Sequence, residues 1–313
     1  MRQTEDKDRI ETKEMCEAIK RSGYPLEQRA KTLLQRCGYS VELNSSYPDP
    51  KSGVSREFDI WAAKGRLIFP GTLGTLLAVL VCECMNNPQP VVFFESDYSD
   101  QHTWRFCEDI KCSGIPVKFW VAQAYRYLPV YLGFAGFHHC ASGPFSTQYC
   151  SFQRKKDQVW QAFHDERSHQ TFETITHALE TCIDLHYGLI KAPEPDLQSP
   201  PSIRIYYPVL ILQGDLYLAR QGRRGVTLGR KQEVQYRREI WTGGRPVVYQ
   251  VDVITESHIP SFIRMVETEI QQVGQSLGGA KQLFDESVTR IVDDYRENRT
   301  GRPPWRTILE YRE

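Results

Sequence analysis

The pattern of hydrophobic and polar residues changes its period along the chain and so outlines the expected elements. Apolar residues recur at helical spacing over residues 25–37, with Pro25 in the first turn and Gly38 just past the end, so this segment is predicted to be a helix. Residues 39–47 and 55–63 are rich in strand-forming residues and are separated by a cluster of turn-forming residues. They are predicted to form the two strands of a hairpin.

More strands and one long helix are predicted in the rest of the N-terminal half. Residues 75–84 are nearly all apolar, as expected of a central strand that is covered on both faces. Residues 91–95 and 115–121 also have the composition of strands. Between residues 157 and 188 the apolar positions recur at intervals compatible with a helix.

A proline-rich segment divides the chain. Residues 191–202 contain four prolines and few apolar residues, so we expect a linker there. After it, a helical stripe from Ile259 to Leu277 predicts the first of two helices, and strands are expected at 203–213, 215–221, 231–241 and 246–255. The fold class is therefore predicted to be α/β. Residues 1–190 would form one domain and residues 203–313 a C-terminal α+β extension, either separate or fused to the same core.

Composition narrows the possible classes of function. Lys plus Arg and Asp plus Glu both number 39 in the 313 residues, so binding to nucleic acid or to an anionic membrane would require a local patch. The longest apolar stretch, residues 75–82, is too short to span a bilayer, and the charged N-terminus lacks a signal-peptide core. The nine cysteines are then expected to be reduced thiols in a cytoplasmic protein with no membrane partner.

Three acidic residues stand out by their positions. Glu27 falls in the first turn of the first predicted helix, Asp59 lies inside the second hairpin strand, and Glu83 ends the apolar central strand. If the two strands pair in suitable register, the carboxylates converge at one end of a sheet and suit a hard divalent cation. The alternatives are a favourable charge at a helix N-terminus for Glu27, an edge position for Asp59 and a solvent-facing Glu83.

The order of these segments resembles the PD-(D/E)xK, or restriction-endonuclease-like, superfamily of metal-dependent nucleases. The segments that carry the resemblance are GYPLEQRAKTLLQRCGYSVELN, SREFDIWAA and LAVLVCECMNNPQP, within residues 23–95. The resemblance implies a mixed central sheet flanked by helices in residues 1–190. It further implies that Asp59 and Glu83 bind Mg²⁺ or Mn²⁺ and that Glu27 is an accessory acid, in an enzyme that cleaves DNA.

The sequence departs from the family pattern where the family has a lysine. The tripeptide here is Glu83-Cys84-Met85, and methionine neither donates a proton nor carries a charge. Losing one such stabilising group costs about 10²- to 10³-fold in rate. Lys31, one turn after Glu27 on the predicted helix, is a candidate replacement. Lys64 is a weaker candidate, because strand parity puts it on the opposite face from Asp59.

A second group of potential metal ligands is interpreted as structural. His138, His139 and Cys140, taken with Cys107 and Cys112, lack the paired spacing that zinc sites have, so buried thiols and loop histidines are expected instead. On the predicted central strand, alternation puts Cys82 and Cys84 on one face, away from Glu83.

A local excess of basic residues is the candidate nucleic-acid surface. One acid interrupts the run, whose members are Arg220, Arg223, Arg224, Arg230, Lys231, Arg237 and Arg238. Such a patch in a neutral protein indicates phosphate binding, and double-stranded DNA is the expected partner. The alternative is a solvated hairpin rim, because exposed strand edges often carry positive charge.

The sequence thus favours a Mg²⁺-dependent, restriction-endonuclease-like nuclease that cleaves DNA. One alternative is an inactive copy of that fold, kept as a DNA-binding or protein-interaction module, which Met85 favours. Another is a structural α/β protein, in which Glu27, Asp59 and Glu83 would not converge.

Overall fold

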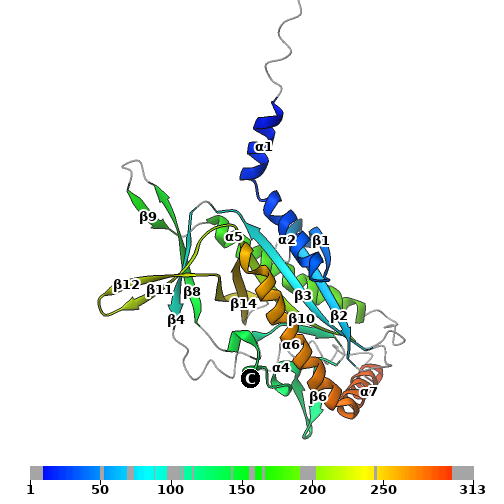
Figure 1. The fold of residues 1–313 in the computed structure, drawn as a ribbon. Coiled ribbons are helices and arrows are strands. Elements are labelled where there is room, and N and C mark those ends of the chain that lie inside the picture. Colours follow the sequence, from blue (N-terminus) through cyan, green and yellow to red (C-terminus); the bar gives the residue numbers. More distant parts are fainter. Residues whose placement is uncertain are drawn as a thin grey trace, which may run out of the picture.

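A mixed β-sheet with helices on both faces forms the centre of the molecule (Figure 1). The computed structural model describes residues 10–49, 53–68, 74–87, 89–96, 107, 109–114, 116–141, 144–154, 159–163, 166–190, 202–242 and 245–297. The helices are α1 (Thr12–Arg21), α2 (Tyr24–Arg36), α4 (Leu128–Tyr131), α5 (Glu166–Ile190), α6 (Ile259–Gly279) and α7 (Lys281–Glu297). Short 3-10 turns occur at Phe134–Gly136, His139–Ala141 and Glu256–His258.

Most of the strands belong to a single sheet. The strands are β1 (Ser40–Pro48), β2 (Ser55–Leu67), β3 (Thr75–Met85), β4 (Val91–Ser96), β5 (Cys112–Gly114), β6 (Lys118–Val121), β7 (Ala124–Tyr127), β8 (Phe145–Arg154), β9 (Trp160–Phe163), β10 (Ser202–Leu212), β11 (Leu216–Gly222), β12 (Gly225–Lys231), β13 (Glu233–Thr242) and β14 (Arg245–Thr255). The main sheet runs β1-β2-β3-β10-β14-β13-β8-β4-β11-β12, with β5 beside β10 and β9 beside β8. Strands β6 and β7 pair separately.

Pairing between β3 and β10 joins the two halves of the chain. Strands β1, β2 and β3 form an antiparallel meander, and β10 then pairs in parallel with β3 from Ser202 opposite Thr75 to Leu212 opposite Met85. The predicted boundary at 191–202 therefore does not separate two sheets, and the C-terminal region is fused to the core of the N-terminal one. Residues 191–201 themselves lie outside the described residues.

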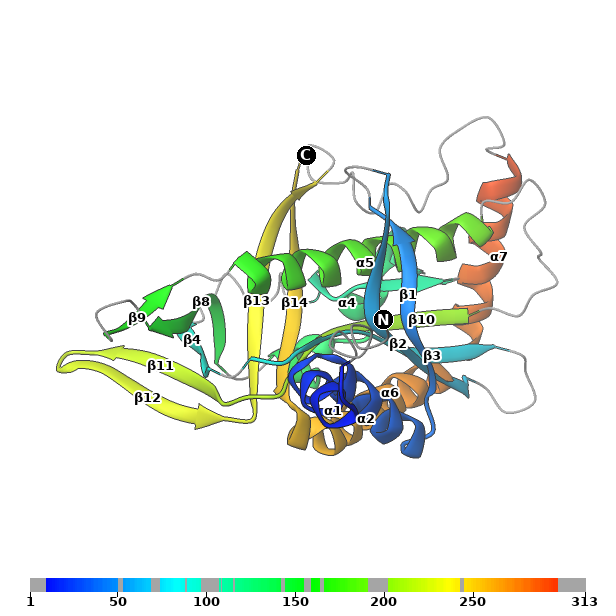
Figure 2. The ribbon, with the colours of Figure 1, turned by 90° about the horizontal axis from the view of Figure 1, so that it is seen from above.

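Helices cover the central strands on both faces, and this produces two hydrophobic clusters. Figure 2 shows α5 on one face of the sheet and α2 with α6 on the other. Cys82 lies in the cluster under α2 and α6, and Val81 lies in the cluster under α5, as strand parity predicts. Because both faces of β3 are covered, its nearly continuous apolar sequence is explained by burial.

Several segments differ from the sequence prediction, which did not include α1, β5, β7 or β8. Residues 160–163 form strand β9 instead of the start of a helix, because they pair with β8 and that long-range pairing overrides the local pattern. Residues 225–231 form β12, which was not predicted, since six of its seven residues are exposed and leave no alternating buried face. The strand expected at 115–121 begins only at Lys118.

Two hairpins, β11–β12 and β8–β9, project from one end of the sheet (Figure 1). The β11–β12 hairpin carries exposed apolar side chains on β12, at Val226 and Leu228. Within the described segments, none of the helices is both long enough and apolar enough to cross a membrane.

Candidate functional site

Glu27 lies in the first turn of α2 with its carboxylate close to the helix N-terminus. Leu26 and Ala30, on the same helix, are fully buried in the hydrophobic cluster between α2 and the sheet. Glu27 lies beside them and is only 7% exposed. A Cβ atom at Gly23, the residue before the helix, would come within 3.3 Å of Glu27 Oε1. The absence of a side chain at Gly23 therefore leaves room for this carboxylate beside the positive end of the helix dipole.

Asp59 and Glu83 meet where the regular pairing of β2 with β3 ends. The last register pair before them is Ile60 with Cys82. Beyond it, the backbone N–H of Asp59 donates to Glu83 Oε1 at 3.3 Å, and the backbone N–H of Cys84 donates to Asp59 Oδ2 at 2.7 Å. Side-chain oxygens here take the role that carbonyl oxygens have in a regular ladder.

The strand also changes face at Asp59. Phe58 packs with Tyr47 in the cluster under α5, with 6.1 Å between ring centroids, whereas Ile60 packs in the cluster under α2 and α6. A regular strand would place Phe58 and Ile60 on the same face. The irregularity frees Asp59 to turn its carboxylate across the end of β3.

Burial raises the pKa values of all three carboxyl groups, and the charge of Asp59 adds to the effect on Glu83 and Glu27. Burial, with the Asp59 charge adding to it, raises the pKa of Glu83 well above its ordinary value. Burial and then the Asp59 charge also raise the pKa of Glu27. Burial raises the pKa of Asp59, although the hydrogen bond from Cys84 opposes this effect. The structure thus brings the three predicted acids to one end of the sheet, within electrostatic range of each other.

Asp59 and Glu83 are the pair best placed to hold a hard cation at this end of the sheet. Two groups of three ligand side chains in the described residues have their ligand atoms within 4.8 Å of one another, and neither includes Glu27, Asp59 or Glu83. A shared contact by all three carboxylates would therefore need rearrangement. Mg²⁺ is usually bound by one or two carboxylates and keeps several waters, and Asp59 and Glu83 could supply these two carboxylates.

The nuclease superfamily that the sequence resembles has a lysine two residues after the second acid, and this chain has no cation at that position. Met85 is half-buried and packs against the cluster under α5. Lys31 is half-buried and makes no hydrogen bond or ion pair within the described part of the chain. Arg29 binds Glu256 through two hydrogen bonds, from Nε at 2.6 Å and from Nη2 at 2.9 Å.

The side chain of Lys64 is bound to groups away from Asp59 and Glu83. Its ammonium group donates to the Cys37 carbonyl oxygen at 2.7 Å and pairs with Glu267 of α6. Its register partner on β3 is Ala78, five residues before Glu83. A role for Lys64 beside Asp59 and Glu83 is not compatible with these contacts.

The structure divides the basic run into two parts. Arg223 and Arg224 lie in the exposed turn of the β11–β12 hairpin, and Arg230 and Lys231 follow on β12. By contrast, Arg237 of β13 is half-buried.

Ion pairs within the protein occupy several of these cations. Arg220 pairs with Glu95, Arg230 pairs with Asp215, and Arg237 pairs with Asp109 at 3.1 Å. Arg238 on β13 also has an interaction with another group. Arg223 and Arg224 make no such contact with described residues, so they are the members of the run best placed to meet an external phosphate.

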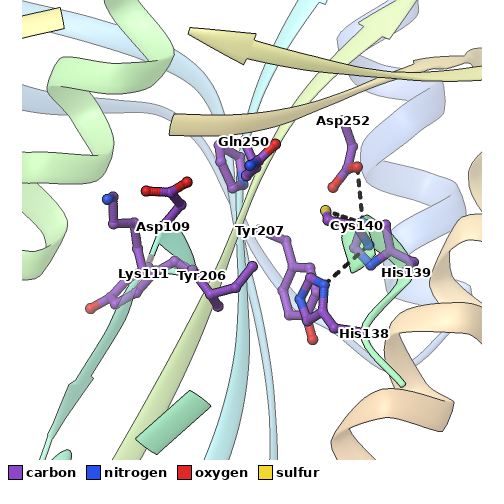
Figure 3. Close-up of a pocket in the computed structure, with 11 residues that line it drawn as sticks. Asp109, Lys111, His138, His139, Cys140, Tyr206, Tyr207, Gln250 and Asp252 are labelled. Carbon is purple, nitrogen blue, oxygen red and sulfur yellow. Dashed lines mark hydrogen bonds and ion pairs between the residues drawn. The ribbon is translucent and has the colours of Figure 1, made fainter. Parts of the chain in front are cut away.

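The second group of potential ligands, at His138, His139 and Cys140, lies in and beside a short 3-10 turn, and its side chains are buried. Asp252 of β14 approaches the ring of His139 (Figure 3). Glu233 of β13 lies within 4.8 Å of both. Cys107 and Cys112 are not part of these ligand groups.

Sequence reasoning missed Glu233 and Asp252, which lie about 100 residues from the histidines. The sequence signal was the pair of adjacent histidines followed by a cysteine, which lacks the usual ligand spacing. No protein-family model, curated protein or solved structure matches this chain.

Proposed function

We propose that this protein is a restriction-endonuclease-like nuclease that hydrolyses DNA with Mg²⁺ or Mn²⁺ bound by Asp59 and Glu83. The observation that carries the proposal is the pair of hydrogen bonds between neighbouring strands in which the Glu83 carboxylate accepts from the Asp59 N–H and the Asp59 carboxylate accepts from the Cys84 N–H. Glu27 would act as the accessory acid from the first turn of α2. A mixed sheet with α2 and α5 on opposite faces is the architecture that the family resemblance implies, and this supports the proposal.

Electrostatics also favour a cation at this position. Burial and the Asp59 charge raise the pKa of Glu83, so the ionised pair is unfavourable, and neither carboxylate has an ion-pair partner in the described part of the chain. A divalent cation would offset that repulsion. Bound at Asp59 and Glu83, it would also lower the pKa of a coordinated water and polarise a phosphate oxygen, which are the two requirements of phosphodiester hydrolysis.

Because Met85 replaces the family's lysine, we expect slow DNA cleavage. Without the family's lysine, we expect cleavage about 10²- to 10³-fold slower than with that group. Lys31 and Arg29 are the candidate substitutes, both from α2. Lys31 has no partner among the described residues, whereas Arg29 would have to leave Glu256.

The β11–β12 hairpin is the proposed contact to DNA. It is a projecting two-stranded ribbon with Arg223 and Arg224 exposed in its turn (Figure 1). A two-stranded ribbon has dimensions that the major groove admits. Arginines at its tip would supply phosphate contacts in a protein whose net charge is zero.

The second candidate function is that of an inactive nuclease fold that binds DNA or another protein. Met85 favours it, because an apolar side chain occupies the position of the catalytic cation. The hydrogen bond from the Cys84 N–H to Asp59 also shows that this carboxylate already has a partner without metal.

A plasmid-nicking assay distinguishes the two functions. Supercoiled plasmid is incubated with the protein and Mg²⁺ or Mn²⁺, and the variants Asp59→Asn and Glu83→Gln are compared with Glu57→Gln, an exposed acid on the same strand. We expect nicking that is lost in the first two variants and kept in the third. DNA binding without nicking, by folded wild type in both metals, would instead support the inactive module.

A further inference from the structure

The ring of His139 lies between two buried carboxylates at the end of the chain segment that follows α4. Its Nε2 atom is 2.9 Å from Asp252 Oδ1, and its Nδ1 atom is 2.9 Å from Glu269 Oε1. The side chains of His139, Asp252 and Glu269 are 7%, 3% and 4% exposed. Glu233 completes the group, because its carboxylate lies within 4.8 Å of His139 and Asp252.

We propose that His139, Asp252 and Glu233 form a second metal site that binds a divalent transition-metal ion such as Zn²⁺. One imidazole nitrogen and two carboxylate oxygens are a ligand set that such ions accept, with a water in the fourth position. In a tetrahedral zinc site, neighbouring nitrogen and oxygen ligands are about 3.4 Å apart. The observed 2.9 Å between His139 and Asp252 needs an opening of only about half an ångström to reach that value.

Residues behind these ligands hold them in the orientation that metal binding requires. Metal-ligating histidines usually donate their second ring N–H to a carboxylate, and Glu269 accepts in this way at Nδ1 of His139. Tyr207 donates its hydroxyl to the other oxygen of Glu269 at 3.2 Å. His258 lies 3.0 Å from Glu233, so that ligand is also positioned. The other ring nitrogen of His139, Nε2, lies 2.9 Å from Asp252 Oδ1 and 3.2 Å from Cys140 Sγ, on the side of the proposed ligands.

The charge around His139 calls for a cation. Three carboxylates, those of Asp252, Glu233 and Glu269, lie close to this ring. Two further histidine rings contact them, His258 at 3.0 Å from Glu233 and His138 at 3.6 Å from Glu269. Three protonated rings would only just balance three carboxylates, so the group carries net negative charge whenever any one of the rings is neutral. Excess buried charge is unfavourable unless a counter-ion neutralises it, and a divalent ion would do so.

Space and an approach path are present at the group. A cavity of about 10 Å³, which is room for about one water molecule, borders His139, Cys140 and Asp252 (Figure 3). Lys111 also lines it, whereas Glu233 does not and approaches the group from outside this cavity. Gln235, the register partner of Asp252, is 7% exposed and donates to the His139 carbonyl, while its Oε1 atom has no hydrogen-bond partner among the described residues.

That buried acceptor would suit a metal-bound water. Glu233 and His258 are each 25% exposed, so the group is reached from solvent on their side. A bound ion would tie the segment containing His139 to β13 and β14, which suggests a structural role for the metal.

Cobalt titration of the full chain, prepared without a histidine tag and stripped with a chelator, tests this site. We expect one saturable site with the intense visible absorption of four-coordinate Co²⁺, displaced by Zn²⁺. Asp252→Asn and Glu233→Gln should weaken binding by at least about 100-fold, and Glu269→Gln by about 10- to 100-fold. Glu239→Gln, an exposed acid on β13, and Asp59→Asn should bind as wild type does.

Three results would overturn the proposal. These are an absence of saturable Co²⁺ binding, wild-type affinity in Glu233→Gln, or loss of the signal in Asp59→Asn. Because Glu233 is partly exposed, its glutamine variant keeps the test decisive even if Asp252→Asn does not fold. The first of these results would leave His139 as an imidazole ion-paired with two carboxylates.

Discussion

The backbone N–H of Cys84 donates to the Asp59 carboxylate at 2.7 Å, and this contact bridges β3 and β2 where their regular pairing has ended. The reciprocal contact runs from the Asp59 N–H to the Glu83 side chain. Two strands are thus joined through acidic side chains, and burial, followed by the charge of Asp59, raises the pKa of Glu83. Such an arrangement is costly to keep without a cation, and the first prediction follows from that cost.

Mg²⁺ should raise the melting temperature of the protein, because a ligand that binds only the folded state stabilises it. At a concentration of 100 times the dissociation constant the expected shift is about 5 °C. The double variant Asp59→Asn, Glu83→Gln should show no shift, as measured by scanning calorimetry. Asp252→Asn is the control and should keep the shift, since it removes a ligand of the other proposed site.

The absence of a magnesium-dependent shift in folded wild type would count against the Asp59 and Glu83 site. A shift that persists in the double variant would place the cation elsewhere. Either result leaves the proposed transition-metal site untouched, because the two groups share no residue.

Met85→Lys should accelerate plasmid nicking by about 10²- to 10³-fold, since it introduces the missing cation two residues after Glu83. The gain should vanish when Asp59→Asn is added. Met85→Leu is the matched control, because it keeps an apolar side chain at this half-buried position.

If wild type already nicks plasmid and Met85→Lys changes nothing, another cation does this work. Plasmid nicking should then be lost in either Lys31→Ala or Arg29→Ala, and the variant that loses it identifies the catalytic cation. If folded Met85→Lys binds DNA but does not cleave it, the nuclease proposal is wrong.

The double variant Arg223→Ala, Arg224→Ala should weaken DNA binding and flatten its salt dependence. Each lost phosphate contact lowers the slope of log K against log salt by about 0.9, so a reduction of about 1.8 is expected. Fluorescence anisotropy with a labelled duplex at several salt concentrations measures this slope.

Arg36→Ala, at an exposed position in the last turn of α2, is the control and should leave the slope unchanged. An equal slope in wild type and in the hairpin variant would mean that the hairpin does not contact DNA. Arg237→Ala is expected to lower stability rather than the salt slope, because Arg237 pairs with Asp109.

Lys118→Met should stabilise the protein at neutral pH. Burial lowers the pKa of Lys118 from 10.5 to about 8, so the folded state disfavours its charged form. Below pH 8 the lysine is charged in both states and the full cost is present. Between pH 8 and 10.5 the unfolded chain binds more protons, so this contribution to stability rises with pH and the cost disappears.

The variant should therefore gain about 1–2 kcal/mol at pH 7, after allowance for partial exposure, and the gain should shrink towards pH 10. Chemical denaturation at a series of pH values measures the difference from wild type. Lys13→Met, at an exposed position on α1, should show no such dependence. A gain of constant size across the range would show that packing, and not the charge, is responsible.

Local sequence patterns were sufficient to predict the elements that bury one face or are buried on both faces. The apolar period of α2 and the continuous apolar run of β3 appear in the structure close to their predicted bounds. Alternation also placed Cys82 and Val81 in opposite clusters, because side chains in a strand must point to opposite faces. The positions of Glu27 and Glu83 at the ends of their elements follow from the same patterns.

Other features of the fold depend on tertiary contacts, and the local pattern of apolar residues does not predict them. Strand β9 exists because it pairs with β8, and β12 because it pairs with β11, although neither has a buried face of its own. The change of face at Asp59 arises where side-chain hydrogen bonds replace the strand ladder. In the basic run, β13 puts Arg237 against Asp109 and away from the hairpin.

The group of side chains around His139 shows most clearly what sequence patterns do not predict. His139 and Asp252 are 113 residues apart in the chain, and only the sheet and the turn before it bring their side chains within 2.9 Å. The sequence by itself determined which residue types were present and where each element would bury its apolar face. Their convergence into a site depended on strand order, which is decided by non-local pairing and packing.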